Sequence, residues 1–208
     1  MVHVRTVDGK PTYFGNAGAL YMNAMTWWDH RTLSIWSQPL GEAISGVRAG
    51  ARLEPLPAQV IAWGPWLASH PQTFVMTNDL ERMGRRRQAF REGFVIGIVL
   101  GDAAKAYPFE TVAAAGAVND QVGGFPVLVW AAGEEYAAYL RRVGDRVLTF
   151  RRDGDSLRDQ ETGSTWDPRL GLATAGPLAG EVLPAAPSHT SYDWAWRDFY
   201  PDAPIYGE

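Results

Sequence analysis

The feature that most constrains this chain is an internal repeat, because residues 29–71 align with residues 159–201 without a gap. The two stretches carry the same residue at 14 of 43 positions. Ordinary residue usage would give about two or three such matches by chance. Half of the shared residues are Gly, Pro or Trp, which have special backbone or packing requirements. The repeat predicts that a duplication produced two halves of the same local shape.

The repeat extends upstream with a different offset. Residues 7–14 match residues 143–150, so the first copy holds six extra residues between positions 14 and 29. Both stretches are typical of hairpins with a Gly/Asp turn. Residues 93–130 have no counterpart before the first copy, and their apolar run at 94–100 predicts a buried strand. Either the ancestor duplicated incompletely, or the sequence begins late and the first copy lacks its front segment; we favour the second explanation.

The composition is that of a folded chain, with 46% hydrophobic and 20% charged residues. The 22 Gly and 14 Pro favour short strands separated by turns. Short helices are predicted at residues 59–69, 110–117 and 188–199. We therefore expect an α+β fold that is mainly β, with two pseudo-equivalent halves and short helices between small twisted sheets or barrels.

Three segments follow from the repeat. Residues 1–77 form a first, incomplete repeat, residues 78–92 form a polar connector, and residues 93–208 form a second, more complete repeat. The two repeats are expected to pack as one unit. If the first repeat lacks strands, an unpaired sheet edge is left, through which the protein could self-associate.

Composition also excludes several kinds of chemistry. The net charge of −4 disfavours a nucleic-acid partner, and the lack of cysteine excludes disulfides, thiolate catalysis and Cys-ligated metals. No apolar run approaches the roughly 20 residues that span a bilayer, so a soluble protein is predicted. No phosphate-binding loop, Ser nucleophile motif or metal-ligand spacing is present, so no catalytic residue, metal or cofactor is predicted. The basic cluster at residues 82–91 is expected to be solvated or paired with neighbouring Glu.

Positions that differ between the copies are the best candidates for a ligand site, since positions that agree serve the fold. His189 replaces Gln59, and at a predicted helix start it would share a face with Asp193, as a proton shuttle or half of a metal site. The structural alternative, which we favour, is a helix cap with a local ion pair. His3 and His30 are interpreted as surface residues.

The other candidates are aromatic or polar. Trp36 and Trp166 recur and are expected in the core, whereas unmatched tryptophans could form a platform for a flat ligand. The loop around residues 36–42 is more polar than its partner, so it could form a hydrogen-bonding rim or simply be solvated. The candidates that complete the proposed ligand site with His189 and Asp193 are Trp63, Trp194, Gln38 and Glu42.

Long motifs run through both halves: LSIWSQPLGEAISG, ARLEPLPAQ and HPQT in the first, and AKAYPFETV, VNDQVGGFPVLV, ETGSTWD and GPLAG in the second. Over nearly its whole length the chain resembles a bacterial and archaeal family, domain-of-unknown-function family 3179. The resemblance implies no activity. Members commonly carry a Cys-Pro-Leu-Cys stretch and often an export signal upstream, which implies an extracytoplasmic location; this chain shows neither feature.

Three functions are compatible with these observations. The leading hypothesis is a non-catalytic duplicated domain that binds an unknown small molecule or polymer near the junction of its halves. The alternative is an enzyme or a redox or metal protein whose reactive groups lie in a missing front segment. The third is a purely structural or partner-binding role.

Overall fold

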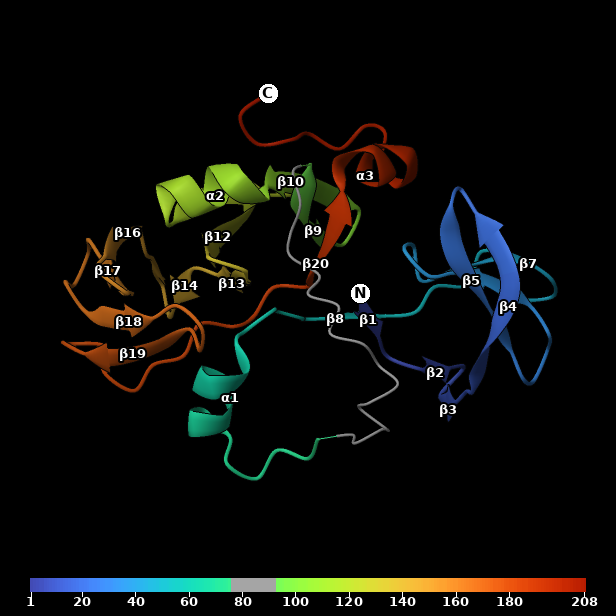
Figure 1. The fold of residues 1–208 in the computed structure, drawn as a ribbon, viewed down its shortest axis with the longest axis horizontal. Coiled ribbons are helices and arrows are strands. Elements are labelled where there is room, and N and C mark those ends of the chain that lie inside the picture. Colours follow the sequence, from blue (N-terminus) through green and yellow to red (C-terminus); the bar gives the residue numbers. More distant parts are fainter. Residues whose placement is uncertain (76–92) are drawn as a thin grey trace, which may run out of the picture.

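Strands dominate the computed structural model, which describes residues 1–75 and 93–208 (Figure 1). The described strands form seven small sheets, and every pairing between them is antiparallel. The prediction of a mainly β fold with small sheets and short helices is confirmed, but barrels are not formed: all the described sheets are open. The helices are α1 (Trp63–Ser69), α2 (Phe109–Ala115) and α3 (Asp193–Phe199).

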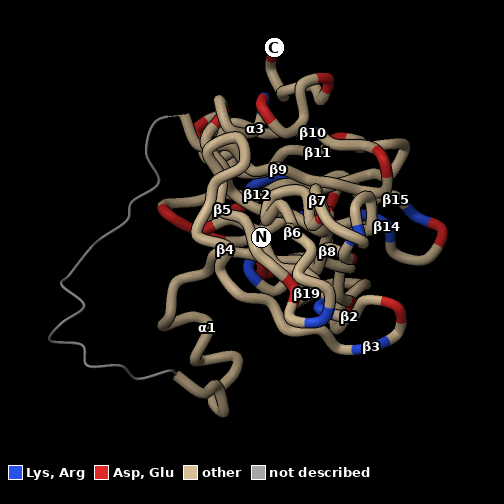
Figure 2. The backbone as a smooth tube through the Cα atoms, turned by 90° about the vertical axis from the view of Figure 1, so that its right-hand side faces the viewer, with Lys and Arg blue, Asp and Glu red and all other residues tan. Residues whose placement is uncertain are grey.

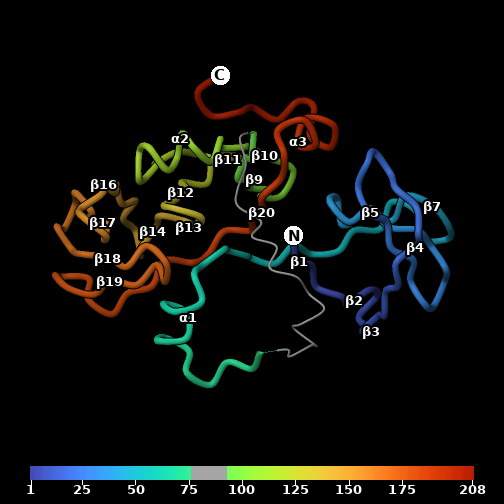
Figure 3. The backbone as a smooth tube through the Cα atoms, viewed as in Figure 1, coloured from blue at the N-terminus to red at the C-terminus, as the bar shows by residue number. Residues whose placement is uncertain are grey.

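Each half contains one four-stranded sheet whose strands lie in sequence order (Figure 3). Both sheets have a register irregularity at the same place, between Ile35 and Trp36 and between Thr165 and Trp166. The six extra residues of the first half lengthen its β4–β5 hairpin. The strands are β4 (Phe14–Tyr21), β5 (Ala24–Asp29), β6 (Ile35–Ser37) and β7 (Glu42–Ser45), then β16 (Phe150–Asp153), β17 (Ser156–Asp159), β18 (Thr165–Asp167) and β19 (Leu172–Ala175).

Two three-stranded sheets lie in the second half, and the largest hydrophobic cluster sits between them and α2. Ile96, Ile98, Val127 and Val129 are fully buried there, which explains why the apolar run at 94–100 forms a strand. The strands are β9 (Phe94–Leu100), β10 (Ala103–Pro108) and β20 (Ser188–Tyr192), and β11 (Val118–Val122), β12 (Phe125–Ala132) and β13 (Glu135–Leu140).

Short two-stranded ladders connect these sheets. The first, between β1 and β8, brings the start of the chain beside residues 55–56. The ladders are β1 (Val2–His3) with β8 (Pro55–Leu56), β2 (Thr6–Val7) with β3 (Lys10–Pro11), and β14 (Arg142–Val143) with β15 (Arg146–Val147).

The two repeated tryptophans occupy matching surroundings. The indole N–H of Trp36 donates to Asp29 Oδ2 at 3.0 Å, and that of Trp166 donates to Asp159 Oδ2 at 2.9 Å. Both indoles are buried, and each makes an edge contact at 5.5 Å with a phenylalanine of its own sheet. They are core residues, not platforms.

The segments that follow the sheets cross from one half to the other. Residues 57–71, the first tail, lie against the second half, where Val60 exchanges two backbone hydrogen bonds with Tyr136. Residues 187–201, the second tail, reach the first half, where the Tyr200 hydroxyl lies 3.5 Å from Pro39 O. Figure 1 accordingly shows α1 below the second half and α3 beside β5 of the first.

Tertiary pairing overrides two of the helix predictions. Val60 forms an antiparallel bridge with Tyr136, so residues 59–62 are not helical and the helix covers only residues 63–69. The predicted helix at 188–199 begins with a strand, β20, that pairs with β9, and becomes helical only at Asp193. The polar connector at 78–92 and the basic cluster at 82–91 lie outside the described residues.

Candidate functional site

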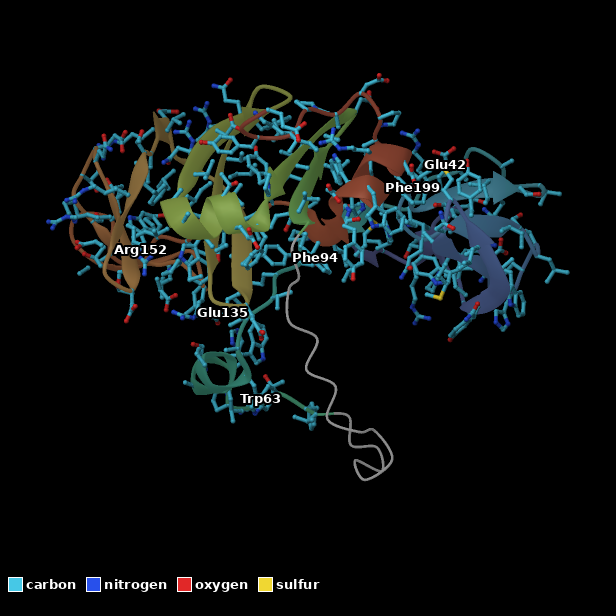
Figure 4. All side chains as sticks on the ribbon, turned by 45° about the horizontal axis from the view of Figure 1, so that its top comes forward. Glu42, Trp63, Phe94, Glu135, Arg152 and Phe199 are labelled. Atoms are coloured by element: carbon cyan, nitrogen blue, oxygen red, sulfur yellow. The ribbon has the colours of Figure 1, made fainter. Side chains whose placement is uncertain are left out.

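A cavity of about 350 Å³ lies at the junction of the halves. The first half contributes residues of β1, the β6–β7 loop and β8, and the second half contributes β9, β20 and the end of α3. A smaller cavity of about 170 Å³ adjoins it and shares Met1, Pro39, His189, Phe199 and Tyr200 with it. Figure 4 shows Phe199 of α3 facing the first half near Glu42. We call the two together the junction cavity.

Aromatic contacts hold the junction together. The rings of Tyr21, near the tip of the long β4–β5 hairpin, and Phe199 lie 6.3 Å apart. The turn of this hairpin is formed by Met22 and Asn23, whose φ values of +50° and +60° are those of a type I′ turn. Ala24, the next residue, lines the cavity. The extra residues of the first half therefore extend the wall of the junction cavity.

His189 is the most deeply buried titratable group of the junction cavity, with 8% of its surface exposed. It lies on β20 opposite Gly97 of β9, and its ring is 5.6 Å from that of Trp196. Burial lowers the pKa of His189 to about 3, and the positive charges of the Met1 amino group and His3 act in the same direction. The imidazole is therefore neutral at pH 7 and able both to donate and to accept a hydrogen bond.

His3 lies in the same cavity, half-buried, so its interpretation as a surface residue was wrong. Its Nε2 donates to Gln38 O at 3.0 Å, which leaves Nδ1 as an acceptor; this buried atom has no hydrogen-bond partner among the described residues. The ring packs against Gly41, where a Cβ would approach Nδ1 to 2.7 Å. Burial lowers the pKa of His3, although the bond to Gln38 opposes this shift.

Charged side chains occur only toward the mouth of the junction cavity. Arg52 Nε donates to Glu42 Oε2 at 2.9 Å, and Arg52 Nη1 lies 4.0 Å from the exposed Asp102 of the second half. Because Arg52 and Asp102 are largely solvent-exposed, this pairing contributes little to stability. The Met1 amino group also lines the cavity, and burial lowers its pKa.

A neutral buried histidine should make the protein acid-sensitive. The unfolded chain takes up a proton near pH 6.5 and the native His189 only near pH 3, so stability falls as the pH decreases through this window. Between pH 7 and 4.5 the loss attributable to His189 is about 2.5 kcal/mol. We expect urea unfolding of His189→Gln to show a pH-dependent loss smaller by that amount. Asp29 and Asp159, whose pKa values are lowered, lose their contribution only below this range.

His30→Gln is the control for this measurement, since His30 is exposed and its ring stacks on Trp28. Its pH dependence should equal that of the wild type. An unchanged pH dependence in His189→Gln would contradict the neutral, buried state of His189.

A second cavity, of about 720 Å³, occupies the corresponding corner of the other half. There Tyr139 stands in the place of His3: its hydroxyl donates to Pro168 O at 2.9 Å, and its ring packs against Gly171 as His3 does against Gly41. The same hydroxyl reaches Gln59 Oε1, in the position of His189, at 3.4 Å. Of the two matched corners, only the junction cavity carries a pair of imidazoles.

The structure brings together three of the six predicted site residues. His189 and Glu42 line the larger part of the junction cavity and Gln38 the smaller part. Asp193 lies instead at the start of α3, where its carboxylate accepts from Trp194 N–H, and no described contact joins it to His189. The helical spacing proposed for that pair was wrong, because His189 is in a strand.

The two candidate platform tryptophans lie elsewhere. Trp194 is half-exposed on α3, with its ring stacked 5.9 Å from that of Tyr192. Trp63 is half-exposed on α1 and projects away from the sheets in Figure 4. Sequence reasoning missed His3 and Arg52. The 136-residue offset pairs His3 with Tyr139 and the 130-residue offset pairs Arg52 with Val182, so both substitutions were detectable.

The described residues contain neither a cluster of metal-ligating side chains nor a helix that could span a membrane. Residues 1–75 and 93–208 contain no group of three or more His, Asp or Glu side chains placed to hold a metal ion. None of the helices in these ranges is long and apolar enough to cross a bilayer. Figure 2 shows acidic and basic positions interspersed along the visible side.

Comparison with known proteins gives one match. The model of a family described as "Protein of unknown function (DUF3179)" matches residues 1–92 and residues 81–203. No curated protein and no solved structure matches the chain significantly.

Proposed function

Because the chain belongs to the DUF3179 family, whose description records no function, we propose a role from its geometry: the protein binds a small uncharged molecule in the junction cavity. The observation that carries this proposal is the pair His3 and His189, neutral imidazoles that face one cavity between two halves. The volume is at the lower end of the range for ligand sites.

The lining indicates the kind of ligand. Pro39, Leu53, Pro187 and Phe199 provide apolar and aromatic walls, which favour a flat or apolar body. His189 offers a hydrogen bond in the interior, where the burial that lowers the pKa of His189 and of the Met1 amino group also disfavours a charged ligand. The ligand we expect is therefore an uncharged molecule with an apolar or aromatic body and one hydrogen-bonding group.

We also infer that residues 1–77 and 93–208 descend from one duplicated unit. The matched surroundings of the two buried tryptophans support this, as do equivalent backbone bonds: Val4 N–H donates to Glu54 O, and Leu140 N–H donates to Pro184 O, both at 2.8 Å. On this reading the two cavities began alike. The junction cavity then acquired His3, His189 and Arg52 where its counterpart has Tyr139, Gln59 and Val182.

The counterpart cavity supplies a matched variant for the test. The double variant His3→Tyr/His189→Gln installs the residues that already meet in the second half, so it should fold. We expect a panel of uncharged aromatic amides and phenols to raise the melting temperature and to show saturation-transfer signals with the wild type. The double variant should lose both effects.

Two results would contradict the proposal. The first is equal binding of the panel to wild type and double variant, which would place the ligand elsewhere. The second is chemical turnover of a bound compound that His189→Gln abolishes, which would make the protein an enzyme.

A further inference from the structure

The two tail helices are matched in sequence position but not in burial. α3 packs against β9 and buries Trp196, whereas α1 contains no buried residue, and Trp66, which corresponds to Trp196, is only partly buried. The stacking partners are equivalent: Trp196 stacks on Tyr200 at 4.4 Å, and Trp66 stacks on His70 at 3.9 Å. What α1 lacks is a strand in the position of β9.

The first tail also presents apolar side chains where the second presents polar ones. Val60, Trp63 and Leu67 are 40%, 50% and 38% exposed. The corresponding residues of the second tail are Thr190, Asp193 and Arg197. Trp63 and Leu67 are four positions apart in α1 and so share one face of this helix, and Val60 lies in the bridge to Tyr136 just before the helix begins. We call these three exposed apolar residues the stripe. An apolar stripe is costly in water unless a partner covers it.

An open backbone edge lies beside this stripe. Val60 uses both its N–H and its C=O on Tyr136, so the backbone groups of its neighbours Gln59 and Ile61 face the opposite side. The N–H groups of Gln59 and Ile61 make no backbone hydrogen bond within the described residues. In the second tail the corresponding edge belongs to β20 and is occupied by β9.

The two cavities also differ by the presence of a strand beside the tail. One wall of the larger part of the junction cavity consists of Val99, Gly101, Asp102 and Ala104, from β9, β10 and the turn between them. The counterpart cavity has no such wall among its lining residues, and its volume is about 720 Å³ against 350 Å³. The poor burial of α1, the free backbone edge at residues 59–61 and the missing wall of the counterpart cavity therefore have one common cause: no described strand lies beside the first tail in the place that β9 takes beside the second.

We propose that residues 58–62 and the adjoining face of α1 bind an extended apolar segment of another polypeptide, which adds as an antiparallel strand. The occupant is a polypeptide because an open strand edge offers hydrogen-bonding groups at a two-residue interval, which a peptide backbone complements. It is apolar because it must cover Val60, Trp63 and Leu67.

The pairing of β9 with β20 serves as a model for the bound segment and predicts the identity of one of its residues. Gly97 lies opposite His189, and a Cβ on it would collide with the Trp196 ring. The residue opposite Gln59 should therefore be glycine, so that the segment can approach Trp66. The same register places apolar residues on both sides of this glycine.

A peptide derived from β9 tests this surface directly. The probe is the sequence of residues 94–100 flanked by two lysines at each end and labelled with fluorescein. We expect saturable binding to the full chain by fluorescence anisotropy, with slowed hydrogen exchange at the amides of Gln59 and Ile61. The same peptide with Gly97→Val should bind at least about tenfold more weakly, because its branched side chain collides with Trp66. Non-specific hydrophobic adsorption would favour the valine peptide instead.

The second tail provides the matched protein variant. Trp63→Asp/Leu67→Arg gives α1 the polar residues of α3; it should retain wild-type stability, since both side chains are exposed, and should weaken peptide binding at least about tenfold. Absence of saturable binding, equal binding to this variant, or protection at residues 188–192 through exchange with β9 would each overturn the proposal. So would self-association that the double variant abolishes, because the occupant would then be a second copy.

Discussion

Replacing Gly97 by alanine should lower the free energy of unfolding by about 3 kcal/mol or more, since overpacking a rigid core has few routes of relief. A Cβ at this position would overlap Trp196 Cζ3 and lie 2.6 Å from Cε3. The ring cannot retreat easily because it is buried and stacked on Tyr200. The substitution should also disturb His189, which pairs with Gly97 across the strands. Guanidinium unfolding measures the first effect and the ring-proton shifts of His189 measure the second.

Gly64→Ala is the control for this substitution. No atom lies within 4 Å of a Cβ built on Gly64, and its backbone is that of the α1 helix. Alanine there should stabilise the protein by up to about 1 kcal/mol, since it favours the helical conformation and restricts the unfolded chain. If Gly97→Ala were as well tolerated as Gly64→Ala, the packing of Trp196 against β9 would be wrong.

Removing either buried aspartate of the four-stranded sheets should be similarly costly. Asp159 accepts hydrogen bonds from Trp166 Nε1, from the amide and hydroxyl of Thr162, and from Ser164 N–H. Burial alone would raise the pKa of Asp159, but these bonds outweigh it and hold the pKa below its usual value. Asp159→Ala leaves several buried donors unpaired, so we expect a loss of about 3–5 kcal/mol in urea unfolding.

The first half should behave in the same way. Asp29 accepts from Trp36 Nε1 at 3.0 Å and from Thr32 N–H at 2.7 Å, so Asp29→Ala should cost a similar amount. Asp198→Ala, on the exposed side of α3, should stay within about 0.5 kcal/mol of the wild type. A loss confined to one of the two buried aspartates would show that the matched contacts do not carry matched energies.

The sequence predicts those parts of the fold that depend on local pattern. The apolar run at 94–100 is buried on both faces, so its composition alone indicates a strand. The repeat likewise predicts that Trp36 and Trp166 are core residues. Ser188–Tyr192 has no apolar alternation and becomes a strand only because β9 pairs with it. Residues 59–62 have helix-compatible composition, but Val60 bonds to Tyr136 and the helix begins only at Trp63.

Differences between the two copies indicate some of the residues that line the candidate site, but not all of them. His189 and Glu42 were found in this way, and both line the junction cavity. Asp193 was paired with His189 by helical spacing, which fails because His189 is in a strand and Asp193 begins a helix, so their side chains point in different directions. His3 joins the cavity through β1, and no local pattern indicates that contact.

Because each tail packs against the opposite half, the shape of each cavity depends on both halves. The tails meet where the Ser188 hydroxyl donates to Ala58 O at 2.8 Å, two residues that occupy the same place in the repeat. Each of the two cavities is therefore lined by residues from both parts of the chain, and a change in either tail alters a wall of one of them. A substitution near the contact between Ser188 and Ala58 should therefore affect the junction cavity and the counterpart cavity together.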